Sequence, residues 1–227
     1  MVTTQQKTIR EEAMKGVFIT LEGGEGCGKS TQIRLLGEAL RAAAPGREII
    51  VTRSPGGTPA AEKIRSVLKE PLPGDDLTAE TELMLFAACH AQMCAKLIRP
   101  ALERGAILLA DRFCDSTEVY QGAARGLSAE WIRKVCDFVR KGTTPDLTLL
   151  LDIEPAAGLA RTRSRSQNPE NDRFDSENLG FHTAVRNGFL ELARREPGRI
   201  CVIDASADAQ TVQQNIREVC RERLGLF

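Results

Sequence analysis

The 227-residue sequence has no net charge, only two histidines and few aromatic residues. Lys and Arg together number 31, as do Asp and Glu, whereas a protein dedicated to nucleic-acid binding usually has a basic excess. No window approaches the ~20 consecutive apolar residues of a membrane-spanning helix. Residues 1–15 are polar and lack the apolar stretch of a signal peptide, so we expect a flexible extension there, with a short added helix as the alternative. These absences argue against a nucleic-acid or membrane partner.

The seven cysteines form no C-x-x-C pair and no Cys/His cluster with the spacing of a zinc site. Their number is odd, and several lie in apolar or helical stretches. This predicts buried, reduced thiols and a cytoplasmic protein. Hydrophobic residues make up 42% and charged residues 27%, which excludes collagen-like and disordered chains. A chain of this length can bury one large core.

Short apolar runs alternate with helical patterns along the chain. We expect strands at 17–21, 49–51, 106–110, 147–151 and 200–203. We expect helices at 30–44, 58–68, 78–104 and 177–196, and others that begin near 128, 155 and 208. This alternation is typical of an α/β protein with a parallel sheet covered on both faces. No internal repeat or long linker divides it, so we expect one domain over 16–227.

Residues 23–30 match the phosphate-binding pattern G-x-x-x-x-G-K-[ST], after an expected strand and at the start of an expected helix. The glycines allow successive backbone N–H groups to face a bound phosphate at the positive end of the helix. We expect Lys29 to reach the β- and γ-phosphates. The expected ATP-binding residues here are Gly23, Gly24, Glu25, Gly26, Cys27, Gly28, Lys29, Ser30 and Thr31.

Two oxygen-bearing side chains are candidates for a Mg²⁺ site. The Ser30 hydroxyl follows the lysine of the loop, as in other phosphate-binding loops. Asp111 ends the third expected strand, where a carboxylate would hold a water on the metal; helix capping or an ion pair with Arg112 is the alternative. Asp152 has a similar strand-end position and is interpreted as structural.

Several arginines are predicted to surround the phosphate loop: Arg53, Arg112, Arg161, Arg163, Arg165 and Arg173. Arginine suits phosphate because its planar guanidinium presents a fork of donors. Arg161, Arg163 and Arg165 could instead solvate one helix. Their place beside the polar segment 166–176 favours a mobile lid over about 161–176, which would close over ATP and exclude water.

The scarcity of histidine bears on the reaction. A kinase that acts on an alcohol needs a base, whereas an acceptor phosphate is already largely anionic at pH 7. An arginine-rich site without an evident base therefore favours a nucleoside monophosphate acceptor, which needs positioning and charge neutralisation. No N-K-x-D stretch is present to read guanine, which argues against a regulatory GTPase.

Residues 16–225 resemble the bacterial type of thymidylate kinase (dTMP kinase). The resemblance is carried by several motifs in order: residues 21–30, Thr-Arg-Ser-Pro-Gly-Gly-Thr at 52–58, Asp-Arg-Phe at 111–113, Tyr-Gln-Gly at 120–122, Pro-Asp-Leu at 145–147 and Asp-Arg-Phe at 172–174. It implies the reaction ATP + dTMP → ADP + dTDP with Mg²⁺, in dTTP biosynthesis. It also implies the sheet order 2-3-1-4-5 and a homodimer.

The resemblance further implies roles for single residues. Glu25 would hold the sugar 3′-hydroxyl, Tyr120 would crowd the 2′ position, and Phe86 would stack on thymine. Arg53 and Arg112 would grip the acceptor phosphate, and Ser116 and Gln121 would line the nucleoside pocket. Arg163 and Arg165 would act in catalysis with Lys29, Arg53 and Arg112, while Arg161 and Arg173 would bind ATP. Core packing is the alternative for Phe86 and Tyr120.

The chain departs from the family pattern at the base pocket. Ser54 replaces a glutamate, and His90 replaces an arginine that helps to read the base. We expect His90 to bind dTMP in its place, because a neutral histidine can still donate one hydrogen bond, although not a fork. Changes at Phe113 and Asp175 are milder. These departures bear on the strictness of thymine selection rather than on the reaction class. The alternatives are another small P-loop nucleotide or deoxynucleoside kinase, or a nucleotide-binding ATPase.

Overall fold

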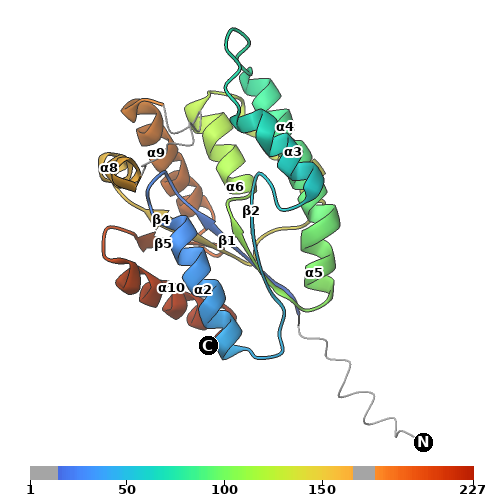
Figure 1. The fold of residues 1–227 in the computed structure, drawn as a ribbon, viewed down its shortest axis with the longest axis vertical. Coiled ribbons are helices and arrows are strands. Elements are labelled where there is room, and N and C mark those ends of the chain that lie inside the picture. Colours follow the sequence, from blue (N-terminus) through green and yellow to red (C-terminus); the bar gives the residue numbers. More distant parts are fainter. Residues whose placement is uncertain (1–14, 166–176) are drawn as a thin grey trace, which may run out of the picture.

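The computed structural model describes residues 15–165 and 177–227. Five parallel strands form one sheet, in the order β2-β3-β1-β4-β5 (Figure 1). The strands are β1 (Val17–Glu22), β2 (Ile49–Arg53), β3 (Ile107–Asp111), β4 (Leu147–Asp152) and β5 (Ile200–Asp204). The predicted α/β class and strand order 2-3-1-4-5 are therefore confirmed.

The described helices cover both faces of the sheet. They are α2 (Lys29–Ala43), α3 (Pro59–Lys69), α4 (Ala79–Met93), α5 (Arg99–Glu103), α6 (Cys114–Thr117), α7 (Ala129–Arg140), α8 (Pro155–Arg165), α9 (Leu179–Arg195) and α10 (Ala209–Leu224), with π-helical turns η1 (Cys94–Ile98) and η2 (Glu118–Ala124). Ile107 and Leu109 pack in the cluster under α2 and α10, whereas Leu108 and Ala110 pack in the cluster under α4 and α5. This alternation follows from the two-residue period of a strand.

Two helical regions differ from the prediction. The single helix expected over 78–104 is divided into α4, η1 and α5. The helix α6–η2 was not predicted, because its first turn is polar and lacks an apolar period. Asp115, Ser116 and Thr117 of that turn are nonetheless buried, so hydrophobicity could not reveal the segment.

All seven cysteines are free thiols, and all except Cys201, which is half-buried, lie in the interior. The expected extension falls outside the described residues except for Lys15, and so does the expected lid beyond 165. Among the helices that the structure describes, none is long and apolar enough to cross a membrane.

Candidate active site

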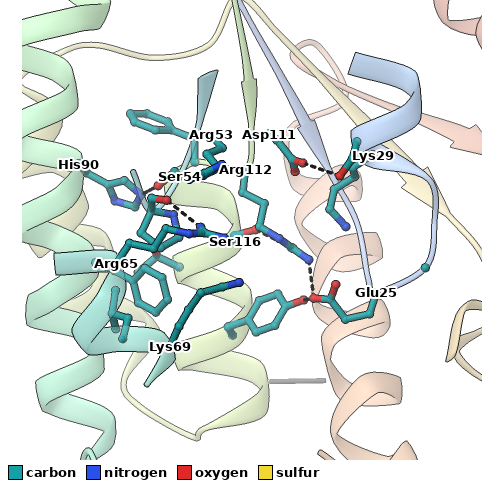
Figure 2. A pocket seen from close by; sticks show the side chains of 18 of the residues that line it. Glu25, Lys29, Arg53, Ser54, Arg65, Lys69, His90, Asp111, Arg112 and Ser116 are labelled. Atoms are coloured by element: carbon teal, nitrogen blue, oxygen red, sulfur yellow. Dashed lines mark hydrogen bonds and ion pairs between the residues drawn. The ribbon is translucent and has the colours of Figure 1, made fainter. Parts of the chain in front are cut away.

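A cavity of about 390 Å³ lies at the carboxyl ends of β1, β2 and β3. Open α/β sheets place ligands at this edge, between strands whose connections run to opposite faces. Of the predicted site residues, the cavity brings together Glu25, Gly26, Gly28, Lys29, Ser30, Arg53, Phe86, His90, Asp111, Arg112, Ser116 and Tyr120. Figure 2 shows Lys29 and Glu25 on one side of this cavity and His90 with Ser54 on the other.

The remaining predicted residues lie outside the lining. Gly23, Gly24, Cys27 and Thr31 belong to the phosphate loop or the helix turn behind it, and Gln121 is fully buried. Arg161 donates to the backbone carbonyls of Ala205 and Ser206 at 2.8 Å each, and Arg163 is exposed at the end of α8. The Arg165 side chain and all of Arg173 lie outside the described part of the chain.

The phosphate loop connects β1 to α2, as the motif predicts. Gly26 and Gly28 have φ values of 70° and 94°, in the left-handed region that favours glycine. A Cβ at Gly26 would lie 1.9 Å from the Gly158 carbonyl oxygen of α8. Gly26 therefore also allows close backbone packing, which fixes the loop against the helix that carries Arg161 and Arg163.

The Lys29 ammonium lies inside the loop rather than in bulk solvent. Its Nζ donates to the carbonyl oxygens of Gly23 at 3.0 Å and Gly24 at 2.7 Å, and the residue is 7% exposed. The positive charge is thus held at the floor of the loop, where it faces the cavity. A charge in this position can neutralise a phosphate that the N-terminus of α2 also attracts.

The candidate metal ligands lie together at the mouth of the loop. Ser30 Oγ donates to Asp111 Oδ2 at 3.3 Å, although 81 residues separate them in the chain. Both ligands are oxygen donors, which suits Mg²⁺. Among the described residues there is no cluster of three or more His, Cys, Asp or Glu side chains for a metal. The donor set therefore fits an ion that takes its other ligands from water and nucleotide phosphates.

Arg112 is the central cation of the cavity. Its guanidinium donates to Glu25 Oε1 at 2.6 Å, to Ser116 Oγ at 3.0 Å and to the Gly23 carbonyl at 3.0 Å. It also lies 5.1 Å from the centre of the Tyr120 ring. The backbone φ of Arg112 is 70°, which is rare for a residue with a side chain. This turn directs the arginine from the end of β3 toward the phosphate loop.

The Glu25 carboxylate receives two strong donors on one oxygen. Arg112 and the Tyr120 hydroxyl, at 2.9 Å, both donate to Oε1, which leaves Oε2 for a ligand. Burial alone would raise the pKa of Glu25, but the charges of Arg112 and Lys29 and the Tyr120 hydrogen bond lower it to about 2. Glu25 is therefore an ionised acceptor at pH 7.

Arg53, which lines the cavity, forms an ion pair with Glu62. Arg53 Nη2 lies 3.0 Å from Glu62 Oε2, and Glu62 Oε1 accepts from the Gly57 amide at 2.9 Å. The Gly57 hydrogen bond and the Arg53 partner lower the pKa of Glu62. Because Arg53 is more than half exposed, this contact orients the guanidinium and adds little to stability.

Sequence reasoning missed a buried carboxyl behind the arginine. Glu22, at the end of β1, is fully buried and accepts from the Phe113 amide at 2.7 Å and the Ser116 hydroxyl at 2.5 Å. Burial and the nearby Asp115 raise the pKa of Glu22. Through Ser116, the Glu22 carboxyl is linked by hydrogen bonds to the Arg112 guanidinium. In the sequence, Glu22 could have been noticed as the glutamate immediately before the first glycine of the phosphate loop.

The base side of the cavity is lined by Phe86, Ser54 and His90. Gln121 lies behind it and donates to Glu82 Oε2 at 3.0 Å, while its own buried Oε1 has no hydrogen-bond partner among the described residues. His90 hydrogen-bonds inside the protein with both ring nitrogens. Phe86 is half-buried at the wall, so a flat ligand could stack on it.

A second buried histidine was not predicted. His182 of α9 lies with Glu25 and the loop glycines around a small cavity behind the phosphate loop. Neither ring nitrogen has a hydrogen-bond partner within the part of the chain that the structure describes. Nearby, Arg186 donates to both oxygens of Asp152, at 2.8 and 3.0 Å, which agrees with the structural interpretation of that aspartate.

A five-stranded parallel sheet whose phosphate loop opens on an arginine-lined cavity defines a P-loop nucleotide kinase. The sequence pattern of the family described as "Thymidylate kinase" matches residues 21–216. The chain belongs to the thymidylate kinase family.

Relatives cover nearly the whole chain. It is 50% identical over 203 residues to a thymidylate kinase of Pseudomonas fluorescens, covering 89% of this chain and 94% of that one. It is 47% identical over 212 residues to a thymidylate kinase of Caulobacter vibrioides, covering 93% and 99%. The crystal structure of thymidylate kinase from Ehrlichia chaffeensis is similar with a TM-score of 0.73 and 30% identity, covering 91% and 99%.

Proposed function

We propose that the protein transfers the γ-phosphoryl group of ATP to dTMP, giving ADP and dTDP, in the supply of dTTP. The observation that carries this proposal is the arrangement of Arg112. One side chain contacts the phosphate-loop carbonyl of Gly23, the Glu25 carboxylate and Ser116. An acceptor phosphate at Arg112 would therefore lie beside the phosphates of a nucleotide held by the loop.

The two nucleotides would occupy opposite sides of the one cavity. ATP phosphates would lie on the backbone amides of residues 23–31 with Lys29 against the β- and γ-phosphates. The acceptor phosphate would lie between Arg53 and Arg112, with thymine stacked on Phe86. Glu25 Oε2 would accept from the 3′-hydroxyl, because Oε1 already accepts from Arg112 and Tyr120.

The transfer itself needs no side-chain base. A phosphate oxygen of dTMP, ionised at pH 7, attacks the γ-phosphorus; the bond to the β-phosphate oxygen breaks, and ADP leaves with that electron pair. Lys29, Arg53 and Arg112 would neutralise the negative charge that builds up between the two nucleotides. Arg163 and Arg165, at the end of α8, are proposed to add charge when a lid over about 161–176 closes.

Mg²⁺ would be held by Ser30 and, through a water, by Asp111. Their separation of 3.3 Å and their position at the loop mouth support this assignment. The ion supplies charge neutralisation on the ATP phosphates when bound. Among the protein's own groups, Asp111 would orient a metal-bound water, and Ser30 would contact the ion through its hydroxyl oxygen.

We also propose a homodimer in the cytoplasm. Seven free thiols favour a reducing compartment. Trp131 and Phe138 of α7 are 65% and 77% exposed, an apolar surface that a second copy would cover. Light scattering at micromolar concentration should give about 50 kDa, twice the 24.8 kDa of one chain. A mass near 25 kDa would contradict the dimer.

ADP release from Mg²⁺-ATP with dTMP, thymidine or no acceptor tests the reaction. We expect release that depends on dTMP and little release with thymidine. Arg53 and Arg112 would bind an acceptor phosphate, and Glu25, the candidate base of the phosphate loop, is a weak base because its pKa is lowered to about 2. Strong activity with thymidine would indicate a deoxynucleoside kinase. Equal release without an acceptor would indicate an ATPase.

A further inference from the structure

Three hydrogen-bonded, neutral side chains end at the cavity wall beside Phe86. His90 Nε2 lies 2.9 Å from Ser54 Oγ, and His90 Nδ1 lies 3.5 Å from Cys114 Sγ. All three residues are at most 5% exposed, yet Ser54 and His90 form part of the cavity wall beside Phe86. Figure 2 shows the contact between Ser54 and His90, on the side of the cavity away from Lys29.

The environment keeps these groups uncharged and fixed. Burial lowers the pKa of His90 to about 4 and raises the pKa of the Cys114 thiol well above its ordinary value. The imidazole is therefore neutral at pH 7 and the thiol keeps its proton. The His90 ring also packs on Phe113, with ring centres 5.0 Å apart. A neutral imidazole has one donor and one acceptor nitrogen, so the direction of either hydrogen bond determines the other.

We propose that Ser54 reads the 4-oxo group of the pyrimidine, and that Cys114 and His90 position its hydroxyl for that contact. The proposal rests on the acceptor pocket proposed above. The 4-oxo oxygen only accepts, so Ser54 must donate to it. Ser54 Oγ then accepts from Nε2–H of His90, and Nδ1 accepts from the Cys114 thiol.

The opposite direction would suit a different base. If His90 carried its proton on Nδ1 and donated to Cys114, Nε2 would accept from the Ser54 hydroxyl. Ser54 would then present a lone pair, which matches the 4-amino group of cytosine. The His90 tautomer therefore distinguishes the two kinds of pyrimidine. Because each contact is neutral, we expect weaker discrimination than a guanidinium would give.

The substrates that test this are dTMP and 5-methyl-dCMP, which differ at the base edge and share the methyl group and the sugar phosphate. We expect Ser54→Ala to lower kcat/KM for dTMP about tenfold, mainly through KM, while 5-methyl-dCMP changes little. Cys114→Ala should lower the dTMP preference, and Cys114→Ser, which keeps a donor, should retain it. An unchanged preference in Ser54→Ala would overturn the proposal.

Phe86→Leu separates this proposal from the pocket on which it depends. It should raise KM for both nucleotides by a similar factor, because stacking does not depend on the donors at the base edge. If Phe86→Leu leaves both KM values unchanged, the acceptor pocket is elsewhere, and the proposed contact between Ser54 and the base is also ruled out. If Phe86→Leu raises both KM values but Ser54→Ala leaves the preference for dTMP unchanged, the acceptor pocket is supported and the proposal that Ser54 reads the base is wrong.

The tautomer can be measured with Ser54, His90 and Cys114 unchanged. The chain has only two histidines, so the ¹⁵N-imidazole spectrum of the dTMP-bound protein contains two rings, and His182→Asn assigns them. We expect His90 to carry its proton on Nε2, with Nδ1 unprotonated. A His90 ring protonated on Nδ1 in the dTMP complex would overturn the proposal.

Discussion

Replacing Arg112 with methionine tests the electrostatic centre of the site. Methionine keeps a long side chain but removes the donors to Glu25, Ser116 and Gly23. The change leaves the Glu25 carboxylate, whose side chain is 22% exposed, without its charged partner. Removing one member of a buried ion pair generally costs about 3–5 kcal/mol, because the other charge remains desolvated.

The pKa of Glu25 gives a second magnitude, for all the partners of this carboxylate together. Against burial, which raises it, Arg112, Lys29 and the Tyr120 hydrogen bond lower this pKa from 4.5 to about 2. A difference of this size between folded and unfolded states corresponds to about 3 kcal/mol of stability at pH 7. The folded-state pKa is the lower one, so this stabilisation is present above pH 4.5 and is lost as the pH falls toward 2.

Urea unfolding at pH 7 and pH 3.5 measures both effects. We expect Arg112→Met to lower the free energy of unfolding by about 3 kcal/mol at pH 7 and by roughly 1 kcal/mol less at pH 3.5. The double variant Arg112→Met, Glu25→Gln should recover most of the loss at pH 7, because no unpaired charge remains. Glu25→Gln alone serves as the control.

Three outcomes would refute this reasoning. The first is a cost below about 1 kcal/mol at pH 7, the range of an exposed ion pair. The second is an equal cost at both pH values, which would mean that Glu25 ionisation is not involved. The third is a double variant as unstable as Arg112→Met alone, which would place the loss in packing rather than in charge.

The other predictions concern the loop, the sugar contact and the metal. Gly26→Ala should lower Tm and weaken ATP binding, because its Cβ would lie 1.9 Å from a carbonyl oxygen of α8. The control Gly24→Ala, whose Cβ would have no atom within 4 Å, should have the Tm of the wild type. Equal Tm values for the two variants would contradict this packing. Tyr120→Phe should raise KM for dTMP several-fold with little change in kcat, because Glu25 loses a donor. An unchanged KM would mean that Glu25 does not bind the 3′-hydroxyl of dTMP. Asp111→Asn should raise the Mg²⁺ concentration for half-maximal rate, and an unchanged Mg²⁺ titration would remove Asp111 from the metal site.

The sheet and the phosphate loop could be predicted from the sequence because their signals are local. A β-branched apolar run followed by glycines, a lysine and a serine specifies strand, loop and helix in order. The sequence also placed Asp111 near the phosphate loop, since neighbouring parallel strands end at the same edge. In the structure its carboxylate accepts from the Ser30 hydroxyl at 3.3 Å.

The helix α6–η2 shows what the pattern could not reveal. Its first turn buries Asp115, Ser116 and Thr117, and Asp115 is held by Arg199, 84 residues away, at 2.7 and 2.9 Å. Periodicity detects apolar faces, so a helix whose inner face is polar gives no signal. Such a helix becomes stable only when distant partners satisfy its buried groups.

The relation between Ser54 and His90 was also out of reach. Each was recognised separately as a departure from the family pattern, 36 residues apart in the chain. Their 2.9 Å contact shows that the two substitutions form one hydrogen-bonded unit. His90 was expected to read the base itself, whereas both of its nitrogens are engaged inside the protein, with Ser54 and Cys114.

The most direct test of the central claim follows the phosphoryl group itself. The protein is incubated with ATP labelled in its γ-phosphate, Mg²⁺ and dTMP, and the labelled products are separated. Because Arg112 lies against the phosphate loop and the acceptor pocket at once, we predict that the label appears in the β-phosphate of dTDP and that little is released as inorganic phosphate. Label found only in inorganic phosphate, with dTMP unchanged, would contradict the account.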